Sequence, residues 1–223
     1  MNNDLIIGFL TGLSSAIVFN PIDKAIYIST TQNINITNPS IWKNCFKGTL
    51  ITINTRIITS GLYFSYLDYL TSTSSNNLHS AIITSLLCST TNPLQLIKFH
   101  SWYNNISIHN SFTFIKKYYG YKGFLIGITP LIFRDLLFNY LYISYKKKDN
   151  DLFNLFLISS SLIIISPINL IKNKKYASNQ PLHLIIKHFK FNQLAISQGI
   201  FRTTLNFYFS QSLYNILKSN ISI

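Results

Sequence analysis

The sequence contains no glutamate, and its six acidic residues are all aspartates. Lysine and arginine together number 19, which gives a net charge of +13, yet charged residues of both signs make up only 11% of the 223 positions. A soluble domain usually has about a quarter of its residues charged. Because the hydrophobic share is 48%, much of this chain is expected to lie away from water, which argues against a soluble helical enzyme.

Cysteine is also scarce, and the motifs of catalysis are missing. Cys45 and Cys88 have neither metal-ligand spacing nor the dense, even count of a secreted disulfide scaffold. No catalytic Ser-His-Asp or Cys-His set, metal cluster or phosphate-binding glycine loop is recognisable in the sequence. We therefore predict no enzymatic activity, no catalytic residue, no cofactor and no metal.

The basic excess raises two further possibilities, which the pattern of residues does not favour. A nucleic-acid partner would call for a basic stripe, but long uncharged runs separate the lysines and aromatic residues are not interleaved with them. A secretory signal or an Arg-rich presequence is not expected either, because Met1 to Asp4 run directly into an apolar segment. Nucleic-acid binding is not expected, and any targeting signal is expected to be internal.

Six stretches of the chain could cross a bilayer, whose core requires about 20 mainly apolar residues per helix. Three of them have no charged residue and the other three have one arginine each near the middle. Short polar connections predict antiparallel neighbours, so the whole chain is expected to be one all-α transmembrane domain. The predicted spans are Leu5–Ile22, Thr49–Leu70, Asn77–Ile97, Ile128–Tyr145, Leu152–Ile171 and Ile196–Leu217.

The lysines predict the orientation of these spans. Twelve lysines lie in the connections between the first and second, third and fourth, and fifth and sixth spans, whereas four lie on the opposite side. Since loops on the inner side of a membrane collect lysine and arginine, both termini are expected on the outer side.

A repeat runs through the chain, because a proline closes each odd-numbered span at Pro21, Pro93 and Pro167. These prolines are 72 and 74 residues apart. A small residue opens each even-numbered span at Gly48, Gly127 and Ala195, and an arginine follows it by 8, 7 and 7 positions. The predicted repeats cover about residues 1–72, 73–148 and 149–223.

This pattern resembles the mitochondrial carrier family, in which each of three repeats has Pro-x-[Asp/Glu]-x-x-[Lys/Arg] followed by a short amphipathic helix and an aromatic-[Lys/Arg]-Gly motif. Short segments between proline and glycine, and uncharged residues at Ile26, Gln95 and Asn169, resemble the trimmed carrier-like proteins of some giant DNA viruses. The resemblance implies six transmembrane helices in three pseudo-symmetric pairs. It also implies a location in the mitochondrial inner membrane, that of the host for a viral protein.

The resemblance further implies functional positions. Three prolines would bend the odd-numbered helices, and charged or polar residues near them would close an inner gate, with Asp23 pairing with Lys98 and Gln95 with Lys172. The implied substrate contacts are Thr55, Arg56, Arg134, Asp135 and Arg202. The implied inner gate is Asp23, Gln95, Lys98, Asn169 and Lys172, the helix kinks are Pro21, Pro93 and Pro167, and the implied outer gate is Asp68, Lys147, Asn215 and Lys218.

The three arginines also point to an anion without reference to any family. An arginine at the centre of a membrane helix costs about 2.5 to 3.5 kcal/mol on insertion scales, and such residues face a polar interior. Guanidinium groups bind carboxylate and phosphate in bidentate fashion. We therefore expect Arg56, Arg134 and Arg202 to line a water-filled cavity that takes a small anionic substrate, moved by alternating access.

The substrate stays open between classes. Three cationic positions favour a nucleotide or deoxynucleotide, whereas Arg134 with Asp135 resembles the contact pair of amino-acid carriers, and a keto acid is a further alternative. A non-transporting carrier fold that serves as a membrane interaction module is the rival from another class. We also expect the lipid bilayer, with cardiolipin as a lipid partner, to surround the protein. The protein is expected to be monomeric.

Overall fold

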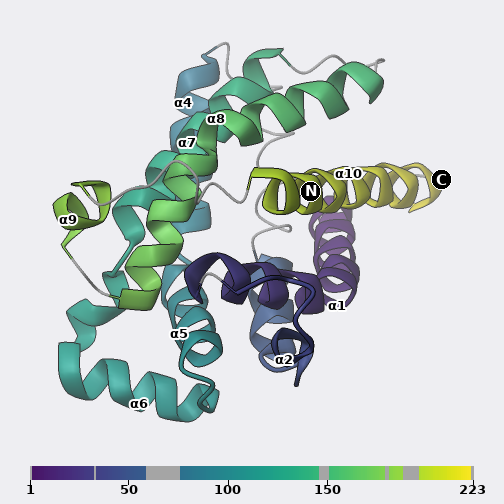
Figure 1. The fold of residues 1–223 in the computed structure, drawn as a ribbon. Coiled ribbons are helices and arrows are strands. Elements are labelled where there is room, and N and C mark those ends of the chain that lie inside the picture. Colours follow the sequence, from purple (N-terminus) through teal and green to yellow (C-terminus); the bar gives the residue numbers. More distant parts are fainter. Residues whose placement is uncertain are drawn as a thin grey trace.

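The part of the chain that a computed structural model describes is all-α, as predicted (Figure 1). It comprises residues 2–32, 34–58, 76–145, 151–178, 181–187 and 196–221. Residues 49–58 are helical as well. The named helices are α1 (Asn2–Gln32), α2 (Pro39–Trp42), α4 (Asn77–Ser89), α5 (Asn92–Tyr103), α6 (Ile108–Tyr119), the 3-10 helix η1 (Tyr121–Leu125), α7 (Ile128–Tyr145), α8 (Asp151–Ser178), α9 (Leu182–Lys187) and α10 (Ile196–Ile221).

Three helical stretches of the described residues are long and apolar enough to cross a membrane: Ile6–Gln32, Tyr121–Tyr145 and Phe153–Ala177. They contain most of the first, fourth and fifth spans predicted from the sequence. Three such stretches in one chain indicate a multi-pass membrane protein.

The other three predicted spans differ from these. The third is divided, because α4 ends at Ser89 and α5 begins at Asn92, with Thr90 and Thr91 in a turn between them. The sixth corresponds to α10, which is 26 residues long but more polar. The second is described only as far as residue 58.

Side chains are distributed with apolar residues outward and many small polar residues inward. Exposed positions of α1 and α8 include Val18, Phe156 and Ile164, whereas Ser15 and Ser161 are buried. Ser161 donates to the carbonyl of Leu157 at 2.8 Å, and buried Thr and Ser of α1 and α4 bond within their own helices in the same way. A helix can bury hydroxyls at low cost when carbonyls of the preceding turn accept hydrogen bonds from them. Apolar residues that face outward suit a lipid environment.

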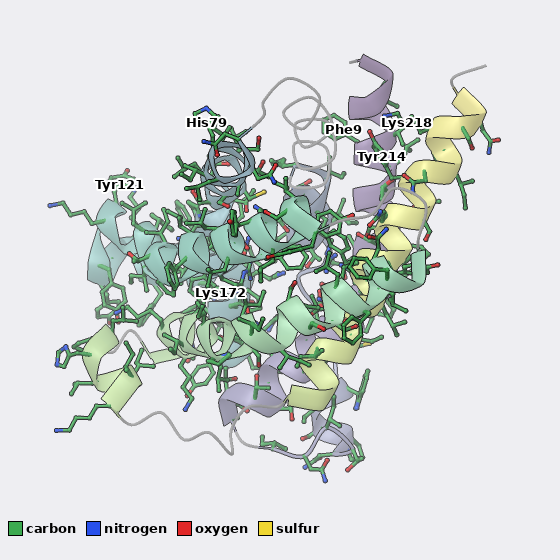
Figure 2. All side chains as sticks on the ribbon, turned by 90° about the horizontal axis from the view of Figure 1, so that it is seen from above. Phe9, His79, Tyr121, Lys172, Tyr214 and Lys218 are labelled. Carbon is green, nitrogen blue, oxygen red and sulfur yellow. The ribbon has the colours of Figure 1, made fainter. Side chains whose placement is uncertain are left out.

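The long helices pack one after another in a series. Helix α4 packs on α7, α7 on α8, α8 on α10, and α10 returns to α1. Ile7 near the start of α1 packs against Tyr214 and Leu217 near the end of α10, and Figure 2 shows Tyr214 and Lys218 beside the first turns of α1. Helices α1 and α10 are therefore neighbours, and the N-terminal end of α1 lies on the same side of the bundle as the C-terminal end of α10.

Two matched sets of contacts surround Gly48 and Gly127. The side-chain amides of Asn20 and Asn92, each next to a proline, donate to carbonyls three residues before a glycine of positive φ, Gly48 at 84° and Gly127 at 78°. A Cβ on Gly48 would meet the indole of Trp102, and one on Gly127 would meet the ring of Tyr176. Trp102 and Tyr176 each stand nine residues after a proline, so an aromatic ring of one repeat covers the glycine of the repeat before it.

The three prolines differ in their setting. Pro21 and Pro167 lie inside α1 and α8, whereas Pro93 lies in the first turn of α5, where its missing N–H removes no helical bond. The segments after the prolines meet, since α1, α5 and α8 contact one another pairwise. At this meeting the ring of Phe99 lies 4.4 Å from that of Tyr27 and 5.5 Å from that of Tyr176.

The joint at Gly127 should be sensitive to a single methyl group. We expect Gly127→Ala to lower the melting temperature of the detergent-purified protein more than Gly120→Ala does. Both glycines have positive φ, 78° and 64°, but a Cβ on Gly120 meets nothing within 4 Å. Gly120, at φ 64° and ψ −164°, has a backbone conformation that only glycine adopts readily, so Gly120→Ala already costs about 1 to 3 kcal/mol of backbone strain. A larger loss of stability at Gly127 would therefore report the added contact with Tyr176, about 1 to 3 kcal/mol for a crowded position. Equal melting temperatures would show that the contact between Gly127 and Tyr176 does not affect stability.

Candidate functional site

A cavity of about 400 Å³ lies inside the bundle. Residues of α1, α4, α5, α7, α8, α10 and of the segment 49–58 line it, so every long element contributes. All of the substrate contacts and inner-gate residues expected from the sequence are among its lining residues. These are Asp23, Thr55, Arg56, Gln95, Lys98, Arg134, Asp135, Asn169, Lys172 and Arg202.

Asp23 is the centre of the charge network in this cavity. Its carboxylate forms ion pairs with Arg56, at 2.9 Å between Oδ2 and Nη2, and with Arg202. Arg56 also donates through Nη1 to the amide oxygen of Asn206 at 2.7 Å. Since Asp23 lies on α1 and Arg202 on α10, one carboxylate connects the two ends of the chain and the segment 49–58 between them.

A second charge cluster is built on α7 and α8. The guanidinium of Arg134 binds the carboxylate of its neighbour Asp135, with 2.7 Å between Nε and Oδ1. Its Nη1 donates at 3.4 Å to the amide oxygen of Asn169. All three of the arginines therefore bind a carboxylate of the cavity wall.

Lys98 and Lys172 differ from the arginines. The Nζ of Lys98 lies 4.8 Å from the ring centroids of both Phe99 and Trp102, and that of Lys172 lies 5.5 Å from Phe99 and 5.6 Å from Tyr176. Figure 2 shows Lys172 toward the middle of the molecule. The cavity thus contains five cationic side chains against the two carboxylates of Asp23 and Asp135.

The residue pairs expected for the inner gate are arranged differently in the structure. Asp23 pairs with two arginines and not with Lys98. Gln95 donates at 3.0 Å to the hydroxyl of Thr91, in the turn before its own helix, and not to another repeat. Asn169 accepts from Arg134. The residues expected at the gate and those expected to contact substrate therefore form one continuous network.

The expected outer-gate residues lie apart from this network. Asn215 is exposed on α10 and does not line the cavity. The ammonium of Lys218 lies 5.5 Å from the ring of Tyr214 on the same helix, near the start of α1 (Figure 2). Asp68 and Lys147 lie outside the residues that the structure describes.

Several lining residues were not predicted from the sequence. Asn206 stands four positions after Arg202, a spacing that places both on one face of a helix, so the signal for it was present. Tyr27 and Phe99 each stand six residues after a proline of the repeat, which was also readable. Tyr27 is 2% exposed, and its hydroxyl has no hydrogen-bond partner among the described residues.

The sequence as a whole is not matched by any model of a protein family, and no curated protein is significantly similar to it.

The shared carboxylate should be the most sensitive charge of the cavity. We expect Asp23→Asn to lower the melting temperature of the detergent-purified protein more than Asp135→Asn does, because it removes an ion pair from each of two guanidinium groups, whereas Asp135→Asn removes the ion pair with Arg134. Removing one partner of a buried pair costs about 3 to 5 kcal/mol, and less for partly wet pairs such as these, whose side chains are 13% to 18% exposed. Double-mutant cycles should give a larger coupling energy between Asp23 and Arg202 than between Asp23 and Lys98. A larger coupling energy between Asp23 and Lys98 than between Asp23 and Arg202 would contradict this charge network.

Proposed function

We propose that this protein is a membrane solute carrier of the mitochondrial carrier type, and that it moves a small anionic metabolite through the central cavity. The observation that carries the proposal is the charge of that cavity. Five cationic side chains line one cavity within an apolar bundle, and among the described residues two carboxylates oppose them. Intramembrane charges are expensive and mark substrate pathways, so an anion is the ligand that this space suits.

The arrangement of the helices supports the same proposal. The packing of α4 on α7, α7 on α8, α8 on α10 and α10 on α1 is the order expected of helix pairs around a central axis. The matched joints at Gly48 and Gly127 support an internal repeat. On this proposal the segments around residues 49–70, 77–97 and 196–217 also cross the membrane, six spans in all. The mitochondrial inner membrane, of the host for a viral protein, is the proposed location.

Transport by alternating access would use the network around Asp23. An anion entering the cavity competes with Asp23 for Arg56 and Arg202, and a substrate that binds them weakens the ion pairs between α1, residues 49–58 and α10. The meeting of α1, α5 and α8 on the side of the aromatic rings supports closure of the cavity at that end. Rocking of the helix pairs would open it while closing the opposite end.

A nucleotide fits this cavity better than a singly charged metabolite does. The cationic excess calls for a substrate with more than one negative charge, and the rings of Tyr27, Phe99 and Phe138 in the cavity wall give a base a surface to stack on. An amino acid is the second candidate, and the pair Arg134 with Asp135 favours it. If Arg134 and Asp135 moved apart, Arg134 could bind the carboxylate of an amino acid and Asp135 could bind its ammonium group.

Removing a cavity arginine should stop transport without preventing insertion. In proteoliposomes containing the purified protein, we expect Arg134→Ala and Arg202→Ala to lower the uptake of radiolabelled nucleotides by about tenfold or more, the loss of one charge-assisted contact. Lys117→Ala, an exposed lysine of α6, is the matched control and should transport normally. Membrane extraction should show all three variants inserted. Normal uptake in both arginine variants would contradict the arginine-lined site. If the unaltered protein moved no nucleotide, amino acid or keto acid, the carrier proposal would be wrong, and a non-transporting membrane interaction module would replace it.

The orientation is open to a separate test. The distribution of lysines predicts both termini on the outer side, and the packing of Ile7 against Tyr214 and Leu217 puts both ends on one side of the bundle. A tag at either terminus should be digested by protease added to the outer face of the inner membrane, while a tag inserted at residue 181, before α9, should be protected. Protection of both terminal tags would reverse the topology.

A further inference from the structure

The two lysines of the cavity are its cations without a carboxylate among the described residues. Lys98 is 6% exposed and Lys172 is 3% exposed, and the described carboxylates of the cavity, Asp23 and Asp135, form their ion pairs with arginines. A buried ammonium needs an opposing charge or hydrogen-bond acceptors to offset the loss of hydration. Aromatic faces offset only part of that loss. The cavity wall therefore leaves two adjacent positive charges for something else to neutralise.

The position of the two lysines is set by the repeat. Each stands five residues after a proline, Lys98 after Pro93 and Lys172 after Pro167, while the equivalent position in the first repeat is Ile26. Both ammonium groups lie against the ring of Phe99, at 4.8 and 5.5 Å from its centroid. One aromatic ring thus has a cation from each of two repeats, and both cations belong to the wall of the same cavity.

We propose that Lys98 and Lys172 form a binding site for the phosphoryl groups of a polyanionic substrate. The inference rests on the proposed carrier function and narrows its substrate to compounds with a pyrophosphate or triphosphate group. A single carboxylate would neutralise one ammonium and leave the other buried without a partner. A pyrophosphate group has several negative charges and many acceptor oxygens, and it can bind both lysines at once. The rings of Phe99 and Tyr27 lie next to the site, where a base can stack.

The rival role for these lysines is the closed gate, and the two roles differ in what they predict. A gate residue holds helices together and touches no substrate, so changing it alters the rate or leak for every substrate in the same way. A phosphoryl-binding residue alters affinity, and it does so only for compounds that have phosphoryl groups. The comparison between pyrophosphate and a dicarboxylate such as aspartate therefore separates the roles.

Trp102 offers a readout that needs no transport. The chain has two tryptophans, and Trp102 lies 4.8 Å from the ammonium of Lys98, whereas Trp42 is 41% exposed on α2. In a Trp42→Phe background, the fluorescence of Trp102 reports directly on the ammonium beside it. The detergent-purified full chain would be titrated with pyrophosphate, ADP, AMP and aspartate at constant ionic strength.

We expect saturable fluorescence changes with pyrophosphate and ADP, weaker binding of AMP, and the weakest binding of aspartate. Lys172→Gln should raise the apparent Kd for pyrophosphate by about tenfold or more, the loss of a charge-assisted hydrogen bond, and Lys98→Gln should do the same. The exposed Lys117→Gln is the control and should leave the Kd unchanged. Lys172→Arg, which keeps the charge, should bind pyrophosphate more tightly than Lys172→Gln, a comparison that holds even for variants of lowered stability.

The outcomes distinguish this site from the carrier function on which it rests. Equal Kd values for pyrophosphate in the Lys172→Gln, Lys172→Arg and unaltered proteins would overturn the site, and so would an equal loss of pyrophosphate and aspartate binding. Pyrophosphate binding that depends on both lysines, in a protein whose proteoliposomes take up no nucleotide, would keep the site and overturn the carrier. Nucleotide uptake with an unchanged KM in both glutamine variants would keep the carrier and overturn the site.

Discussion

The ion pairs of Asp23 with Arg56 and Arg202 are the interaction on which the rest of the interior depends. A carboxylate in an apolar bundle cannot be left alone, and neither can two guanidinium groups. Sharing one carboxylate between two arginines joins α1, the segment 49–58 and α10 at a single point. It also leaves the cluster with a net positive charge, so the same contact that holds three elements together keeps the cavity attractive to anions.

Secondary structure and the content of the cavity were largely predictable from the sequence. Long, mainly apolar runs predicted α1, α7 and α8, and one arginine per repeat predicted the charged wall, because few residues other than site residues tolerate that depth. The break between α4 and α5 was not predicted, although Thr90 and Thr91 precede Asn92 and Pro93, a polar run that favours a turn before a new helix.

Partner choice could not be predicted from the repeat alone. Spacing after each proline placed Asp23 and Lys98 on the expected elements, but the side chain of Asp23 binds Arg56 and Arg202. A repeat pattern gives the face of a helix on which a residue stands, while the partner depends on which long side chain reaches that face. Guanidinium groups reach far and bind a carboxylate bidentately, and Lys98 has aromatic rings beside it instead. Asn206 was missed because an amide four residues from an arginine is common on any helix.

The adjacency of α1 and α10 bears on how the chain assembles during synthesis. The first helix meets the segment 49–58 as soon as that segment is made, but α10 is made only after residues 59–195. Of the two arginines that bind Asp23, only Arg56 exists until then. The packing of α10 against α1 is therefore a long-range step of folding, and a ribosome stalled before residue 196 would leave one flank of α1 without its neighbouring helix.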